Sequence, residues 1–196
     1  MIQERLKALR AEMEKRGITV YVVPTADFHE SEYVGDHFKT RKFITGFTGS
    51  AGTAVITLDE AGLWTDGRYF VQAENQLKDS TVTLYRMGEE GVPTVDEFVK
   101  DRLKEGGCLG FDGRVVNGTW GGRLEKIAAE KNVSMHVTED LIDLIWEDRP
   151  ALSKQPLFIL EEKYSGKSTA DKIGDLRKAM KENGADVHIL TSLYDI

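Results

Sequence analysis

The side chains best suited to chemistry in this sequence lie in one short segment, Asp66-Gly67-Arg68-Tyr69. The segment follows an apolar run and precedes a helical pattern, so it is a turn between a strand and a helix, where rigid elements fix side chains. Arg68 carries a planar fork of donors that suits a carboxylate or a peptide carbonyl. A structural interpretation is equally supported: Asp66 caps the following helix, and Arg68 pairs with a surface carboxylate.

Other reactive residue types form no pattern of comparable strength. The histidines lack the HExxH spacing of a zinc site, and no cysteine cluster joins them. His29 lies near Glu30 and Glu32 on a polar stretch, which is more typical of a solvated surface than of a metal site. Four aspartates near strand ends could gather two divalent ions, although aspartates there more often form turns or caps. The histidines are His29, His37, His136 and His188, and the aspartates are Asp27, Asp59, Asp66 and Asp112.

The glycine segment GFTGSAGT invites comparison with a phosphate-binding loop. Gly46, Gly49 and Gly52 recur every three residues, but the lysine of the GxxxxGK[ST] pattern is absent and a strand follows instead of a helix. Phosphate binding is therefore disfavoured. We expect these glycines to serve tight turns and close backbone packing.

Composition excludes several classes of function as the main role. The chain has 196 residues and a formal net charge of -7, whereas nucleic acids and anionic membranes favour a basic face. Cys108 is the only cysteine, so no internal disulfide is possible, and its apolar surroundings predict a core position rather than a nucleophile. The N-terminus lacks the apolar region of a secretory signal, and no apolar run approaches the ~20 residues of a membrane helix. We expect a cytoplasmic protein with no nucleic-acid or membrane partner.

Residues 1–147 alternate helical and strand patterns, which predicts a three-layer α/β sandwich with a mixed central sheet. An amphipathic helix opens the chain, and Gly17 ends it as a C-terminal cap. A hairpin is expected around Asp59-Glu60-Ala61-Gly62, with the glycine supplying a positive φ. Thr94 and Glu97 form a capping box. Further helices are expected at 36–47, 69–77, 94–103 and 120–131, and strands at 18–23, 54–58, 63–65, 82–87, 108–111 and 133–137.

The remaining residues predict a linker and the beginning of a second domain. Residues 148–156 carry two prolines among polar residues, and residues 157–196 predict a helix at 168–183 between strands at 157–160 and 187–190. The pattern Leu9-Arg10-x-x-Met13-x-x-x-Gly17 recurs as Leu176-Arg177-x-x-Met180-x-x-x-Gly184, at an offset of 167 residues. Two unrelated amphipathic helices could produce this match. We favour a second, incomplete domain related to the first, since about forty residues cannot bury their apolar faces alone.

The segments FITGFTGSAGTAVIT and GLWTDGRYFVQAENQL resemble the N-terminal domain of cytosolic-type Xaa-Pro aminopeptidases, within the creatinase and prolidase superfamily. The similarity continues through LIDLIWEDRP, KQPLFILEEKYSGKS and DKIGDLRKAM to the terminal LTSLYDI, so it covers essentially the whole chain. The resemblance implies a creatinase/prolidase-type, ribonuclease H-like first domain and a second domain related to it. A separate catalytic domain would follow, holding two divalent metal ions, usually manganese.

The resemblance further implies a peptide substrate with proline in second position, and a substrate-binding role for Arg68. It assigns no catalytic residue and no metal ligand within the chain itself. We therefore expect a non-catalytic portion of a metallo-aminopeptidase that shapes the substrate cleft and supports dimerisation. Two alternatives remain: a stand-alone binding or assembly module, and the N-terminal domain of a creatine amidinohydrolase-like enzyme, which the WTDGRY segment disfavours.

The tail predicts self-association. Ile173, Leu176 and Met180 form an apolar helix stripe, and 187–190 adds an apolar strand, with nothing in the chain to cover either. We expect a homodimer whose contact includes residues from Leu157 onward. A chain that ends at Asp148 should be monomeric and folded.

Overall fold

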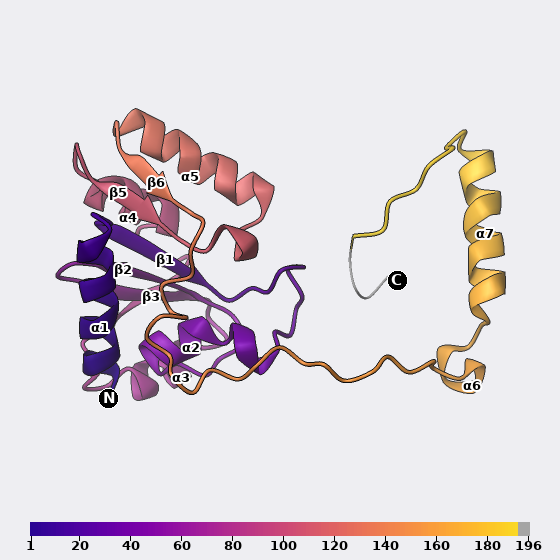
Figure 1. Cartoon of the computed structure of the whole chain (residues 1–196), viewed down its shortest axis with the longest axis horizontal. Helices are drawn as coiled ribbons and strands as arrows, with labels where there is room; N and C mark the ends of the chain where they lie inside the picture. Colours follow the sequence, from indigo (N-terminus) through magenta and orange to yellow (C-terminus); the bar gives the residue numbers. More distant parts are fainter. Residues whose placement is uncertain (192–196) are drawn as a thin grey trace. The chain divides into compact units, whose positions relative to one another are not determined.

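A six-stranded sheet forms the centre of the first part of the chain (Figure 1). The computed structural model describes residues 1–191 and divides the chain into two units, Met1–Ala151 and a second unit from Leu152. The last five residues of the LTSLYDI segment lie outside the described residues.

The strand order of the sheet is β4-β3-β2-β1-β5-β6. β2 runs antiparallel to both of its neighbours, β1 and β3, while the other three pairings are parallel. The carboxyl ends of every strand except β2 therefore meet at one edge of the sheet, and the predicted mixed sheet is confirmed. The strands are β1 (Val20–Pro24), β2 (Thr53–Thr57), β3 (Ala61–Thr65), β4 (Thr83–Arg86), β5 (Cys108–Gly110) and β6 (Ser134–His136).

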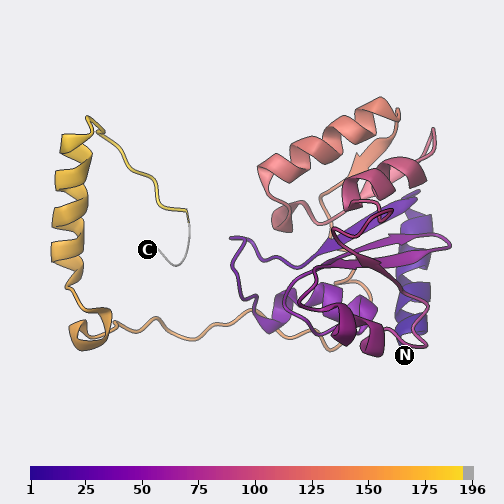
Figure 2. The same ribbon diagram turned by 180° about the vertical axis from the view of Figure 1, so that it is seen from behind.

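Helices cover both faces of the sheet, which confirms the three-layer sandwich. One apolar cluster joins α1, α2 and α3 to one face, and a second joins α4 and α5 to the other, as Figures 1 and 2 show from opposite sides. β1 alternates between the two clusters, with Tyr21 in the first and Val22 in the second. Every residue of this central strand is buried. The helices are α1 (Ile2–Lys15), α2 (Thr40–Thr45), α3 (Phe70–Gln76), α4 (Val95–Arg102) and α5 (Gly118–Glu130).

Helix boundaries follow the caps read from the sequence. Thr94 and Glu97 exchange the predicted capping-box bonds at the start of α4. After α1, Gly17 adopts a φ of +67°, the left-handed conformation that a side chain disfavours. The single helix expected at 36–47 is divided, because a 3₁₀ turn at Asp36–Phe38 precedes α2.

The hairpin between β2 and β3 is present, but the role given to Gly62 was wrong. Gly62 is not in the turn; it pairs with Val55 inside β3. A Cβ on Gly62 would lie 2.6 Å from the Trp64 ring and 2.7 Å from the Tyr85 ring. Those two rings stack with centroids 4.1 Å apart. Gly62 therefore provides space for aromatic packing rather than a positive φ.

The second unit contains α6 (Glu162–Ser165) and α7 (Thr169–Glu182). The helix predicted at 168–183 is confirmed, with Ser168 accepting a bond from Asp171 N and Gly184 at φ +65°. The strands predicted at 157–160 and 187–190 were wrong, since both segments are irregular. A strand requires hydrogen bonds from a neighbouring strand, and neither segment has such a neighbour among the described residues.

Candidate functional site

The segment Asp66–Tyr69 leaves β3 at the sheet edge where the carboxyl ends meet. The Arg68 guanidinium binds Asp66 through two parallel bonds, Nε to Oδ1 at 2.8 Å and Nη2 to Oδ2 at 2.9 Å. The same Oδ1 also accepts the Arg68 backbone N–H at 3.1 Å. The bond from Arg68 is the main cause that lowers the pKa of the Asp66 carboxyl. This closed ring fixes the direction of an otherwise flexible side chain.

Of the two structural roles expected for this segment, the structure shows the ion pair but not the helix cap. Asp66 does not cap α3, whose N-cap residue is Tyr69. Arg68 does pair with a carboxylate, and that carboxylate is Asp66 itself. The Arg68 side chain remains 71% exposed, and its Nη1 donates to no acceptor within residues 1–191. A guanidinium oriented by one carboxylate therefore retains donors for a second acceptor, so the structural pairing and a binding role are compatible.

Tyr69 joins this turn to the glycine segment. Its hydroxyl lies 2.6 Å from Ser50 Oγ, and its ring meets the Phe47 ring edge to face with centroids 5.9 Å apart. Gly49 lies under both rings, since a Cβ there would be 2.2 Å from Phe47 and 2.8 Å from Tyr69. The expectation that these glycines serve turns and close packing agrees with this geometry, as does the φ of +80° at Gly46.

A second copy of the turn was missed in the sequence. Asp112-Gly113-Arg114 follows β5, and Arg114 binds Asp112 through Nε at 2.9 Å and Nη2 at 2.9 Å, with the backbone N–H of Arg114 at 3.0 Å. The two turns lie at the same edge of the sheet because β3 and β5 run parallel. The signal was available, since the letters DGR occur after two apolar runs.

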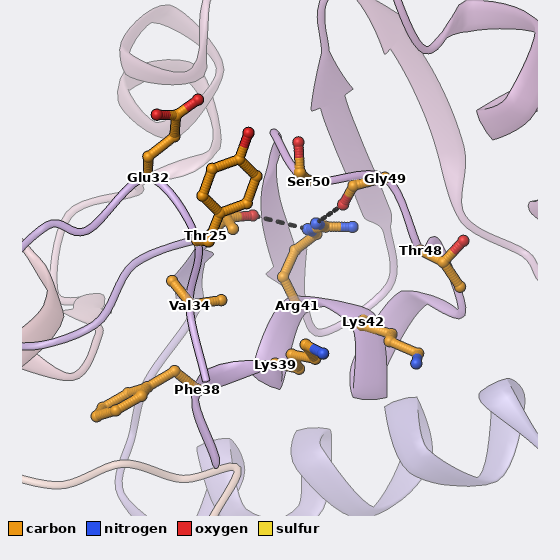
Figure 3. A pocket seen from close by; sticks show the side chains of 11 residues that line it. Thr25, Glu32, Val34, Phe38, Lys39, Arg41, Lys42, Thr48, Gly49 and Ser50 are labelled. Atoms are coloured by element: carbon orange, nitrogen blue, oxygen red, sulfur yellow. Dashed lines mark hydrogen bonds between the residues drawn. The ribbon is translucent and has the colours of Figure 1, made fainter. Parts of the chain in front are cut away.

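Arg41 is the other residue that sequence reasoning missed. It lies on α2 and is only 3% exposed. Its Nε donates to Thr25 Oγ1 at 2.9 Å and its Nη2 to the Gly49 carbonyl (Figure 3). Its Nη1 donates to the Phe47 carbonyl at 2.7 Å. Arg41 therefore fastens the glycine segment to the loop after β1. Burial lowers the pKa of Arg41 to about 10, so the side chain is still charged at neutral pH.

The other histidines, aspartates and the cysteine that were considered as reactive residues form local contacts or are not grouped with one another. His37 contacts the Pro150 carbonyl at 2.8 Å, and His136 contacts Glu139 at 3.3 Å. Asp27 accepts backbone bonds from His29 and Ser31, as a turn-forming aspartate does. His188 and His29 are exposed, Asp59 binds Thr57 at the opposite end of the hairpin, and Cys108 is buried in the core, as expected.

No metal centre is formed by the part of the chain that the structure describes. Within residues 1–191, no three His, Cys, Asp or Glu side chains are grouped so that they could hold a metal ion. Asp66 and Asp112, two of the aspartates considered for a two-metal site, each bind their own arginine instead. Among the same residues, none of the helices has the length and apolar character needed to cross a membrane.

Comparison with known proteins agrees with this arrangement. Residues 5–145 match the Creatinase/Prolidase N-terminal domain family, and residues 148–196 match a second family with the same description. The chain is 42% identical over 196 residues to a probable Xaa-Pro aminopeptidase P of Sordaria macrospora, covering 98% of the chain and 32% of that relative. It is 37% identical over 201 residues to aminopeptidase P2 of Arabidopsis thaliana, covering 100% of the chain and 28% of that relative.

Solved structures show the same relationship. An X-prolyl aminopeptidase from Caenorhabditis elegans, described as a cytosolic enzyme with a di-nuclear active site, superposes with a TM-score of 0.82 and 32% identity over 95% of this chain and 32% of that one. The N-terminal domain of the cytoplasmic peptidase PepQ from Mycobacterium tuberculosis has the same fold, with a TM-score of 0.51 and 24% identity over 72% of this chain and 98% of that one.

The chain thus spans about a third of the length of the curated relatives it matches. The resemblance to Xaa-Pro aminopeptidases seen in the sequence is confirmed by these relatives. With 141 of its residues inside one matched region, the chain belongs to the creatinase/prolidase N-terminal domain family.

Proposed function

We propose that this chain is the non-catalytic N-terminal portion of a metallo-aminopeptidase that removes the N-terminal residue preceding a proline. The names of the relatives support the reaction, and the lack of a grouped ligand set in residues 1–191 supports the non-catalytic part. A catalytic domain outside this chain would hold two divalent metal ions, which would supply the hydroxide that attacks the peptide bond. The peptide substrate, a cytoplasmic location and a homodimer belong to the same proposal.

Arg68 is the residue of this chain that we propose contacts the substrate. The observation that carries this role is its exposed guanidinium, which Asp66 orients through two bonds while Nη1 remains available. Such a fork binds a carboxylate or a peptide carbonyl with defined geometry, and little side-chain freedom must be lost on binding because the ion pair has already fixed the side chain. The turn would then form part of the wall of the substrate cleft.

The test is a chimera in which this chain replaces the matching region of the Caenorhabditis elegans enzyme, assayed with a peptide that has proline in second position. Arg68→Ala should lower kcat/KM roughly tenfold or more, because a charge-assisted hydrogen bond contributes about 1.5–3 kcal/mol. Arg114→Ala is the matched control, since it removes the same carboxylate-bound fork from the other turn. Equal losses in both variants, or full activity in Arg68→Ala, would contradict the role.

The chain by itself should release no N-terminal residue from the same peptide, even with excess manganese. Arg68→Ala should also leave the melting temperature of the isolated chain almost unchanged, because solvent screens an exposed ion pair and leaves it little effect on stability. Hydrolysis by the isolated chain would refute the non-catalytic assignment. Unfolding of Arg68→Ala would show that Arg68 is structural.

A further inference from the structure

The hydroxyl of Tyr21 is a buried group that uses only part of its hydrogen-bonding capacity. Tyr21 lies on the central strand β1 and is 1% exposed. Its oxygen accepts the backbone N–H of Leu141 at 2.9 Å, but its proton is donated to no acceptor within residues 1–191. A buried hydroxyl that donates to nothing is costly, so buried tyrosines normally donate to a protein group or to an ordered water.

A small cavity of the first unit adjoins Tyr21. It lies against the second half of β1 and the beginning of α2, and two buried carboxylates, Asp112 and Asp140, are part of its wall. Its volume is about 10 Å³, which is close to the ~10–15 Å³ needed to hold one water molecule. The cavity is therefore too small for a phosphate group or an organic ligand.

The Tyr21 hydroxyl lies at the end of this cavity where the two carboxylates are found. The N–H group that binds its oxygen belongs to Leu141, the residue directly after Asp140. Burial is the main cause that raises the pKa of Tyr21, and the negative charges of Asp140 and then Asp112 raise it further. A charge effect of this kind falls with distance, so both carboxylates are near the hydroxyl although neither accepts its proton directly in the described part of the chain.

Both carboxylates have an arginine partner and still have room for another hydrogen bond. Asp140 accepts one bond from Ile142 N at 3.0 Å and one from Arg149 Nη1 at 2.6 Å, and Asp112 accepts three bonds from Arg114. A carboxylate has about four lone-pair sites, so each retains a free acceptor position. The cavity therefore suits a neutral ligand that accepts one bond and donates two. A metal ion suits it less, because residues 1–191 contain no group of three possible ligands.

We propose that a single water molecule binds in this cavity, where it accepts the hydrogen bond from the Tyr21 hydroxyl and donates to Asp140 and Asp112. Three hydrogen bonds are the usual number for a buried water. The water would connect β1, the turn after β5 and the segment that contains Arg149, three parts of the first unit that are far apart in the sequence. The proposal does not depend on peptidase activity.

The first test is a high-resolution crystal structure of the whole chain. We expect an ordered water within hydrogen-bond distance of Tyr21 Oη and of a carboxylate oxygen of both Asp112 and Asp140. The proposal is overturned if no water lies there, or if the Tyr21 hydroxyl donates directly to one of the two carboxylates.

The second test counts long-lived waters in solution from the magnetic relaxation dispersion of the water oxygen nuclei. Tyr21→Phe should contain one such water fewer than the unaltered chain, because the ring is kept and only the hydroxyl is lost. Tyr85→Phe is the matched control, since it removes a tyrosine hydroxyl that does not line this cavity, and it should leave the count unchanged. Equal counts in the unaltered chain and in Tyr21→Phe, or an equal loss in both variants, would also refute the proposal.

Discussion

The segments 2–24 and 169–191 follow one pattern at an offset of 167 residues, yet only the first forms a complete structural unit. At this offset the bounds of α1 (Ile2–Lys15) correspond to those of α7 (Thr169–Glu182), and the two helices end in the same way. Ile18 N bonds Met13 O at 2.9 Å, and Ala185 N bonds Met180 O at 2.9 Å. The glycine between them is left-handed in both copies. In each copy the glycine N–H also bonds a helix carbonyl, Gly17 N to Glu14 O at 3.1 Å and Gly184 N to Lys181 O at 3.3 Å, and the two bonds of each copy form a Schellman motif.

The two copies differ in what covers them. In the first, Leu9 and Met13 are fully buried, and the following strand is buried along its whole length. In the second, Leu176 and Met180 are only half-buried, and the residues that correspond to the strand are irregular and exposed. The exposed large apolar side chains described in the second unit are Leu152, Leu157, Phe158, Ile159, Leu160, Tyr164, Ile173, Val187, Ile189 and Leu190. A helix and its caps are thus specified locally, whereas a strand forms only beside another strand.

The largest effect that we predict is loss of self-association when the second copy is removed. The whole chain should be a homodimer whose contact includes residues from Leu157 onward, because each large apolar side chain left in water forgoes about 1.5–3 kcal/mol. A chain that ends at Ala151 should be a folded monomer. Light scattering with circular dichroism measures both properties. A monomeric whole chain, or a shortened chain that fails to fold, would disprove the prediction.

The position of the cut matters, because Arg149 belongs to the core of the first unit. Its Nη1 lies 2.6 Å from Asp140 and 3.0 Å from Asp143, and its Nε donates to the His37 carbonyl. A chain that ends at Asp148 should be less stable than one that ends at Ala151 by about 3–5 kcal/mol, since the buried Asp140 loses its partner. Urea denaturation of the two shortened chains compares them directly.

A smaller contrast is expected between the two helix faces. Leu9→Ala should lower the free energy of unfolding of the first unit by about 2–5 kcal/mol, because it opens a cavity in a packed core. Leu176→Ala, at the corresponding position, should leave that value unchanged within about 0.5 kcal/mol and weaken the dimer instead. Equal destabilisation of the first unit by both substitutions would remove the distinction between a covered and an uncovered copy.

The smallest contrast concerns the two cap glycines. Apart from its chain neighbours, no atom of residues 1–191 lies within 4 Å of a Cβ built on Gly17 or Gly184, so alanine would meet only the backbone cost of the left-handed conformation, about 1–2 kcal/mol. Gly17→Ala should therefore lower the melting temperature of the first unit. Gly184→Ala should reduce helical circular dichroism and leave that melting temperature unaltered. A drop in melting temperature with Gly184→Ala would indicate that α7 stabilises the first unit.

The same contrast explains which features could be predicted from the sequence. The sequences of α1, α4 and α7 contain capping residues and apolar residues at helical spacing, so these helices could be predicted. Strand β1 was predicted because a strand that is buried on both faces appears in the sequence as a continuous apolar run. The strands at 157–160 and 187–190 had the same composition, but composition does not show whether a neighbouring strand exists. Gly62 was misplaced for a similar reason, because its role depends on Tyr85 in another strand.

The candidate site was predictable only in part. Asp66 and Arg68 are two residues apart, so their pairing is local and the segment stood out. The role of Arg41 depends on three acceptors from two segments, the loop after β1 and the glycine segment. Nothing in its sequence context distinguishes it from a surface arginine. The repeated letters DGR at Arg68 and Arg114 were visible in the sequence, but the common edge of the two turns depends on the directions of β3 and β5, which the tertiary fold sets.

Cys108 can serve as a probe of how often the first unit opens locally. It is the single thiol of the chain, it is 6% exposed, and it lies on β5. Its carbonyl accepts the backbone N–H of Thr19, the residue before β1, and its own N–H donates to the Thr19 hydroxyl. A thiol reagent can reach it when the packing around β5 opens, so the labelling rate reports how often that opening occurs. Since β5 pairs with a strand that is almost ninety residues earlier, this one sulfur reports on the surroundings of the most distant pairing in the sheet.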